Sequence, residues 1–250
     1  MKIMQEGARI HRKIQHSMGT MYHAEVPLKI EIPLVSDLGI EYVLQVEGRA
    51  DGIIADINYD EDGNKEPESD AIIDEIKTMQ TDVSLLKEPV YVHKAQALVY
   101  GYIYASQKKL SKIGIQMTYV TPEPETINRF LEEYTFERIE EWFNKLITGF
   151  KRWTDYTFDE RHKRTESIRE LKFPYEYREG QKNLCVSVYR AIEDNTNLYI
   201  QAPTGVGKTL STVFPAVQAL GQQMSDKIFY LTSKTITRTV AEDTYAILRD

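Results

Sequence analysis

One stretch in the C-terminal half of the chain has the residue types of a phosphate-binding loop. Residues 202–209 read Ala-Pro-Thr-Gly-Val-Gly-Lys-Thr, and they lie between a short apolar segment and a segment of helical spacing. Backbone N–H groups at the start of a helix attract phosphate oxygens. We expect Lys208 to pair with the β- and γ-phosphates of ATP and Thr209 to offer a hydroxyl to magnesium. The predicted nucleotide-binding residues of this loop are Thr204, Gly205, Val206, Gly207, Lys208 and Thr209.

Two acidic residues and a lysine in the N-terminal half have the types required for metal-dependent hydrolysis. Glu75 and Lys77 end an apolar run, and on a strand their side chains point to the same face. Asp51 lies between two apolar segments earlier in the chain. Carboxylates from neighbouring strands bind Mg²⁺ or Mn²⁺, while a lysine orients the attacking water or stabilises the developing charge. The acid-x-Lys pair alone is weak evidence, because Glu170 and Lys172 form a second copy with no strand before it.

The order strand-Asp, strand-Glu-x-Lys resembles the PD-(D/E)xK nucleases, and two further motifs resemble their RecB-like branch. His11 ends the sequence Gly-Ala-Arg-Ile-His in the first expected helix. Gln96 and Tyr100 begin and end Gln-Ala-Leu-Val-Tyr in the helix after the second acidic motif. The resemblance implies that His11 joins Asp51 and Glu75 as a metal ligand. It also implies that the Gln-x-x-x-Tyr helix contacts the active site or DNA.

Several residues near these motifs keep a second interpretation. His11 by itself is also typical of a surface or structural histidine, and Gln96 and Tyr100 could serve packing alone. Glu25 is either a further member of the metal shell or an exposed strand glutamate. Other acidic residues are expected outside the ligand set, as neighbours that tune the site or as a solvated loop. They are Glu47 and Asp74 for the first group, and Asp60, Glu61 and Asp62 for the second.

The phosphate loop and its surroundings resemble superfamily 2 helicases. Ala-x-Thr-Gly-x-Gly-Lys-Thr is similar to their motif I, and residues 173–181 are similar to the adenine-contacting element of the XPD and DinG helicases. This resemblance implies that Arg178 and Gln181 contact adenine. Residues 229–238 look like motif Ia, which touches the DNA backbone in that family. No acidic Walker B motif follows Lys208, so we expect a truncated helicase whose ATPase is inactive in the residues present.

Composition limits the class of protein. The length of 250 residues allows one or two domains, and we expect two. The net charge of −7 argues against a wholly basic binder but allows a local basic groove for DNA. Cys185 is the single cysteine, which excludes a disulfide framework and an iron–sulfur cluster within this chain. The sequence has neither a signal peptide nor an apolar run long enough for a membrane, so we expect a cytoplasmic protein.

The spacing of apolar residues predicts an α/β protein. Helices are expected at residues 4–16, 90–107, 136–150, 177–193, 208–220 and 235–248. Strands are expected at residues 22–33, 40–55, 71–76, 113–121, 197–200 and 227–232. Residues 125–134 fit either element, and residues 58–70 are turn-rich and acidic.

These elements and motifs suggest two domains and a linker. Residues 1–155 are expected to form a mixed-sheet, restriction-endonuclease-like nuclease domain. Residues 156–172 are expected to be a linker, because the chain there lacks apolar periodicity. The basic run at residues 161–164 is either a solvated connector or a DNA-backbone contact. Residues 173–250 are expected to begin a P-loop (RecA-like) helicase domain.

The leading functional hypothesis is a nuclease-helicase that acts on DNA, with Mg²⁺ or Mn²⁺ at the first site and ATP at the second. One alternative makes the first domain a non-catalytic DNA-binding module of an ATP-dependent helicase. Another treats residues 173–250 as a nucleotide-sensing module. The sequence favours the first hypothesis because Asp51, Glu75 and Lys77 are all present.

Overall fold

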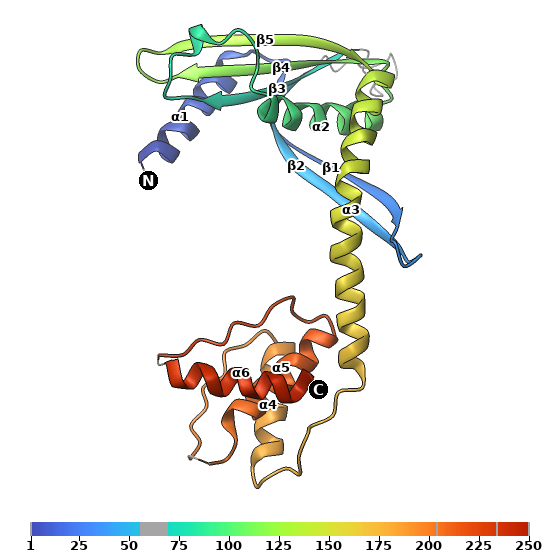
Figure 1. The fold of residues 1–250 in the computed structure, drawn as a ribbon. Coiled ribbons are helices and arrows are strands. Elements are labelled where there is room, and N and C mark those ends of the chain that lie inside the picture. Colours follow the sequence, from blue (N-terminus) through green and yellow to red (C-terminus); the bar gives the residue numbers. More distant parts are fainter. Residues whose placement is uncertain (1, 56–69, 204, 234, 250) are drawn as a thin grey trace, which may run out of the picture. The chain divides into compact units, whose positions relative to one another are not determined.

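The computed structural model describes residues 2–55, 70–203, 205–233 and 235–249. The chain divides into two compact units, Met1–Thr154 and Asp155–Asp250, and each is described separately below (Figure 1). The predicted acidic loop with Asp60, Glu61 and Asp62 lies outside the described residues, as does Thr204 of the phosphate loop.

The first unit is built on a five-stranded mixed sheet in the order β1-β2-β3-β4-β5. Its strands are β1 Tyr22–Val35, β2 Glu41–Ala55, β3 Ala71–Thr78, β4 Lys112–Thr121 and β5 Thr126–Thr135. Neighbouring strands are antiparallel except β3 and β4, which are parallel and joined through helix α2, Tyr91–Lys108. The predicted strands of this unit are confirmed, and the ambiguous segment before the long helix is β5.

Helices α1, Lys2–Ser17, and α2 cover opposite faces of this sheet. Ile10 and Ile14 of α1 pack with Ile76 and Val120. The main core packs buried residues of α2 against the other face, including Ile73, Ile115, Met117 and Tyr119 of the sheet. Because successive side chains of a strand point to opposite faces, Glu75 and Lys77 lie on the α2 face, next to Ile73.

Strands β1 and β2 form a long hairpin that leaves the sheet beyond its contact with β3 (Figure 1). They pair with each other from Tyr22 to Val35 of β1, whereas β2 pairs with β3 over Gly52–Ala55 alone. The alternation of core-facing residues along β2 changes from even to odd positions at this point. Val46 and Ala50 pack in the main core before it, and Ile53 and Ala55 pack there after it. Residues on one face of a regular strand differ by even numbers, so the strand is irregular between Ala50 and Ile53. Asp51 occupies this irregularity.

The second unit contains the last part of α3, Phe136–Arg169, followed by α4 Gln181–Glu193, α5 Lys208–Gly221 and α6 Thr235–Arg249. Its buried residues are Cys185 of α4 and Val213, Phe214, Val217 and Ala219 of α5, among others. The ring of Phe173 packs edge-on against Phe214 at 5.2 Å between centroids. The helices predicted at residues 177–193, 208–220 and 235–248 are thus present, although the first begins at Gln181.

The strands predicted at residues 197–200 and 227–232 are wrong, since the structure has no strand there. Their apolar side chains are strongly exposed, with Tyr199 at 93%, Phe229 at 80% and Leu231 at 89% of full exposure. A strand requires backbone hydrogen bonds to a neighbouring strand. Among the described residues the five strands of the first unit form the one sheet, so these two segments have no strand beside them.

Residues 156–172, predicted to be a linker, are helical as far as Arg169, the last residue of α3. The helix lacks apolar periodicity there because it buries polar residues, including Asp155 and Asp159. The basic run is part of this helix. Within the second unit, Arg161 Nη2 lies 2.6 Å from Asp226 Oδ1, and Arg164 donates to the Asp226 carbonyl at 3.3 Å.

No helix formed by the described residues is both long and apolar enough to cross a membrane.

Candidate functional site

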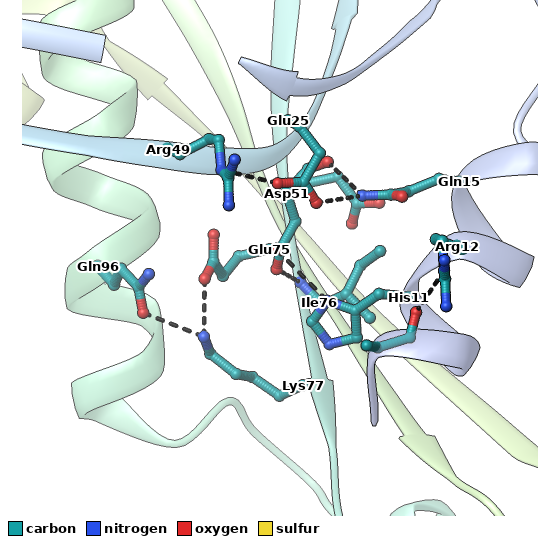
Figure 2. A network of polar contacts seen from close by, with 12 residues as sticks. His11, Arg12, Gln15, Glu25, Arg49, Asp51, Glu75, Ile76, Lys77 and Gln96 are labelled. Atoms are coloured by element: carbon teal, nitrogen blue, oxygen red, sulfur yellow. Dashed lines mark hydrogen bonds and ion pairs between the residues drawn. The ribbon is translucent and has the colours of Figure 1, made fainter. Parts of the chain in front are cut away.

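The predicted acidic residues meet where β2 separates from β3. Asp51 does not continue the ladder between these strands, which ends at the pair Gly52 and Asp74. Instead, its side-chain Oδ2 accepts a hydrogen bond from the backbone N–H of Ile76 at 2.8 Å (Figure 2). The Asp51 carboxylate therefore accepts the Ile76 N–H that β2 leaves free where it separates from β3. This bond fixes Asp51 beside Glu75.

Glu75 is a buried carboxylate with incomplete hydrogen bonding. Its side chain is 2% exposed, and its Oε1 accepts from Lys77 Nζ at 2.7 Å. Its Oε2 is buried without a hydrogen-bond partner. Burial and the nearby charge of Asp51 raise the pKa of Glu75 to about 7, against the lowering effect of Lys77. A bound cation would supply the missing partner of Oε2 and offset the repulsion between the two carboxylates.

Lys77 is held in place from α2. Its Nζ donates to Gln96 Oε1 at 3.0 Å as well as to Glu75 (Figure 2). Gln96 Nε2 donates to Tyr100 Oη at 3.2 Å. Tyr100 in turn lies against Gly48 of β2, where a Cβ atom would meet its Oη at 2.5 Å. The predicted residues Glu75, Lys77, Gln96 and Tyr100 thus form one hydrogen-bonded chain.

His11 approaches the same site from α1. Its Nδ1 lies 3.5 Å from Asp51 Oδ1, and its side chain is 26% exposed. The structure therefore brings His11, Asp51 and Glu75 to one place. Within residues 2–55, 70–203, 205–233 and 235–249, however, no group of three or more histidine, cysteine or acidic side chains is gathered tightly enough to hold a metal ion as it stands.

Asp74 and Glu47 lie away from these ligands. Asp74 is fully buried on the α1 face, where Tyr22, Gln116 and Thr118 donate to its carboxylate. Burial and this carboxylate raise the pKa of Tyr22 far above its usual value. Glu47 is on the hairpin and accepts from Gln45. Asp74 thus has a structural partner set of its own, on the face opposite Glu75.

Two further polar residues of the site, Gln15 and Arg49, did not emerge from the motifs. Gln15 Nε2 donates to the Asp51 carbonyl at 2.9 Å and to Glu25 Oε1 at 3.1 Å, and Arg49 Nε lies 2.8 Å from Glu25 Oε2 (Figure 2). Both oxygens of Glu25 therefore have protein partners. Gln15 lies one turn after His11 on α1, and Arg49 lies two residues before Asp51; these spacings were the available sequence signals.

The phosphate loop of the second unit has the backbone expected for a tight turn before a helix. Gly205 and Gly207 adopt φ values of 87° and 74°, which side-chain-bearing residues rarely adopt, and α5 begins at Lys208. Lys208 Nζ donates to the carbonyl groups of Ala202 and Pro203 at 2.9 and 2.8 Å. The predicted residues Val206 and Thr209 are half-buried beside this turn.

Arg178 and Gln181 contact the loop directly. The Arg178 guanidinium donates to the Gly205 carbonyl, and the Gln181 side chain accepts from the Arg178 backbone N–H at 3.0 Å. A Cβ atom at Gly207 would lie 2.5 Å from Gln181 Nε2. The two residues predicted to contact adenine thus lie on one side of the phosphate loop and brace it.

Among the comparisons with known proteins, the match to a protein family lies within this second unit. Residues 179–249 match the family described as DEAD/DEAH box helicase. A "Probable ATP-dependent helicase MJ0942" from Methanocaldococcus jannaschii is 49% identical over 47 residues, which are 18% of this chain and 7% of that protein. The crystal structure of SSO0001 shares 24% sequence identity and a TM-score of 0.35, covering 57% of this chain and 58% of that one. The C-terminal segment of the chain is thus similar to helicases over residues 179–249, which include the glycine-rich loop and Lys208.

Proposed function

We propose that the first unit is a metal-dependent DNA nuclease and that the second begins an ATP-dependent helicase or translocase of the XPD/DinG type. The observation that supports the nuclease most strongly is the buried Glu75 oxygen without a hydrogen-bond partner. It lies in a site that also contains Asp51 and a lysine held in a defined position. Burying such an oxygen costs free energy unless a cation or a donor binds it.

His11, Asp51 and Glu75 are the residues that would hold Mg²⁺ or Mn²⁺. The cation would polarise the scissile phosphate and lower the pKa of a bound water. Lys77 would place its ammonium next to the reacting phosphate, where it stabilises the charge that develops on the oxygens. Gln96 and Tyr100 would restrict the movement of Lys77, since they complete its hydrogen-bonded chain.

In the second unit, Lys208 would exchange its two loop carbonyls for the β- and γ-phosphates of ATP. Thr209, in the first turn of α5, would offer its hydroxyl to Mg²⁺. Arg178 and Gln181 would link the adenine end of the nucleotide to the loop that they brace. DNA is the proposed partner of both units, because a helicase-type segment implies a nucleic acid.

The nuclease proposal is tested with the 250-residue chain and two variants, Lys77→Ala and Asp51→Ala. Lys77→Ala removes no ligand, so Mn²⁺ should bind as in the parent protein while cleavage slows by about a hundredfold. Asp51→Ala should lose Mn²⁺ affinity and cleavage together. Mn²⁺ binding is measured by calorimetry, and cleavage of labelled single-stranded and duplex DNA is measured under single-turnover conditions.

Lys112→Ala is the matched control, because Lys112 is an exposed lysine of the same unit that pairs with Glu133 at 3.0 Å. It should cut DNA at the parental rate. A parent protein that leaves both DNA forms uncut, and that Mn²⁺ does not stabilise against heat, would instead support a non-catalytic DNA-binding module. A Lys77→Ala protein with the parental rate would remove the lysine from the proposed chemistry.

A further inference from the structure

The strand irregularity at Asp51 extends to Glu25 of the neighbouring strand. Glu25 has a φ of 57°, in the left-handed region that residues other than glycine rarely adopt. It is the position opposite Asp51 in β1, between the pairs Ala24–Gly52 and Val26–Ala50. Unusual backbone of this kind persists where surrounding contacts hold it, and it is concentrated at functional sites.

The contacts that hold Glu25 also orient an arginine. Gln15 binds Glu25 Oε1 at 3.1 Å, and Arg49 Nε binds Glu25 Oε2 at 2.8 Å. Gln15 also donates to the backbone carbonyl of Asp51 at 2.9 Å, which connects the pair to the candidate metal ligand. The two terminal nitrogens of Arg49 make no hydrogen bond to other residues of the described part of the chain, and its side chain is 67% exposed.

The carboxylates of the site repel a DNA phosphate, so a phosphate that binds here needs a cation beside it. Glu25, Asp51 and Glu75 give the site three carboxylates, and Lys77 is already engaged by Glu75 and Gln96. A DNA strand brings several phosphates to such a site, and each must be neutralised close to these carboxylates. Arginine binds phosphate with two parallel N–H donors, and here the Nε–H is used by Glu25 while the other face of the fork is left for a ligand.

We propose that Arg49 binds a backbone phosphate of the DNA at the rim of the site, and that Glu25 and Gln15 are positioning residues that aim its guanidinium. This inference rests on the nuclease function proposed above and adds a phosphate-binding residue to it. Glu25 acts through Arg49, and it does not serve as a metal ligand because both of its oxygens have protein partners.

The first experiment measures DNA affinity in Ca²⁺, which supports binding without turnover in a magnesium-type site, as a function of salt concentration. The probes are a fluorescent single-stranded oligonucleotide of mixed sequence and its duplex. Arg49→Ala should weaken binding roughly tenfold and reduce the salt slope by about 0.9 for duplex DNA. Arg49→Lys should restore the slope but only part of the affinity, because lysine keeps the charge without the fork.

The matched control is Lys29→Ala. Lys29 is also an exposed cation of the hairpin, with its Nζ 2.8 Å from Glu31 Oε1 and its side chain 50% exposed. Its removal changes net charge by the same amount as Arg49→Ala. Parental affinity in Lys29→Ala supports a specific contact by Arg49, whereas equal losses in the two variants would reduce the effect to net charge and overturn the inference.

The role of Glu25 is tested by a double-mutant cycle and by thermal stability. Glu25→Gln should weaken DNA binding in the parent background but have little effect in the Arg49→Ala background, because it acts through that arginine. Glu25→Gly should raise the melting temperature, since glycine accepts a positive φ, while it lowers DNA affinity. A purely structural glutamate would not separate stability from binding in this way, and additive effects in the cycle would contradict the positioning role.

The outcomes separate this inference from the nuclease proposal. If the parent protein cuts DNA with Mn²⁺ but Arg49→Ala binds DNA with parental affinity and salt slope, Arg49 is not a phosphate ligand and the nuclease stands. If Arg49→Ala loses affinity but the parent protein never cuts, the phosphate contact stands and the nuclease fails. Absence of DNA binding by the parent protein overturns the inference itself.

Discussion

At the scale of single residues, folding strongly changes the protonation of Glu75. Its carboxyl group is buried, and Asp51 adds negative charge beside it, so its pKa rises from 4.5 to about 7. Lys77 limits this rise but does not cancel it. The folded protein therefore holds a proton on Glu75 at pH values where the unfolded chain has released it.

This difference predicts how stability depends on pH in the absence of metal. A raised folded-state pKa contributes stability that is fully present below the unfolded value of 4.5 and is lost as the pH rises through about 7. The free energy of unfolding should therefore fall between about pH 5 and about pH 8, by up to roughly 3 kcal/mol. Urea denaturation in EDTA measures it. Glu75→Gln should flatten this dependence, although Lys77 then loses its charged partner.

Glu141→Gln is the control. Lys145 lowers the pKa of this exposed glutamate, so removing the glutamate should leave the dependence between about pH 5 and about pH 8 unchanged. Saturating Mn²⁺ should also flatten the dependence in the parent protein, since a cation favours the ionised carboxylate. An unchanged pH dependence in Glu75→Gln would show that another group is responsible.

At the scale of elements, the fit between β2 and α2 sets the position of Lys77. Tyr100 of α2 lies directly over Gly48 of β2, and a Cβ atom there would meet its Oη at 2.5 Å and its Cε1 at 2.7 Å. Tyr100 is the last member of the chain that passes through Gln96 to Lys77. A side chain at position 48 must therefore displace Tyr100 and loosen this chain.

Gly48→Ala is thus expected to destabilise the protein by about 1–3 kcal/mol through overpacking and to slow cleavage. Denaturant titration and single-turnover cleavage measure the two effects. Gly149→Ala is the control, because a Cβ atom at this position of α3 would meet nothing within 4 Å beyond its own stretch of helix. That change should stabilise the helix by about 0.5–1 kcal/mol and leave cleavage unaffected. A Gly48→Ala protein as stable and active as the parent would contradict the proposed role of this contact.

At the scale of the whole molecule, the two candidate sites belong to different compact units. The first site is formed by α1, β2, β3 and α2, and the second by the loop before α5 and the start of α4. Mutations at separate sites without shared partners have nearly additive effects. Nucleotide binding and DNA cleavage should therefore respond independently to mutation.

Lys208→Ala provides the test. It should abolish binding of a fluorescent ATP analogue, and any ATP-dependent activity, because it removes the cation that faces the β- and γ-phosphates. Mn²⁺-dependent cleavage should stay within about twofold of the parental rate. Lys182→Ala, in the neighbouring helix α4, should affect neither activity. Loss of cleavage in a well-folded Lys208→Ala protein would show that the two sites are coupled.

The local order of the first unit could be predicted from the sequence because its elements have strong apolar periodicity. The strands at β1 to β4, the helices α1 and α2, and the shared face of Glu75 and Lys77 follow from that periodicity. The phosphate loop and the start of α5 follow from the glycines and the lysine at residues 205–208. These features depend on residues close together in the chain, so spacing alone carries the information.

Apolar spacing was a poor guide to two parts of the second unit. The second half of α3 buries polar residues such as Asp155 and Asp159 and contains ion pairs such as Glu160–Lys163, neither of which gives an apolar stripe. The segments at residues 197–200 and 227–232 have the apolar character of strands. A strand exists only with a hydrogen-bonded neighbour, which composition cannot supply.

The residue types available for chemistry can be read from the amino-acid sequence alone, namely His11, Asp51, Glu75 and Lys77 in one unit and Lys208 in the other. Tertiary structure decided how they meet: β2 leaves β3 at Asp51, and Ile76 donates its free N–H to that carboxylate. It also decided that Glu25 takes a positive φ and holds Arg49. These contacts join positions far apart in the chain, and their geometry depends on where two strands separate, which no local pattern encodes.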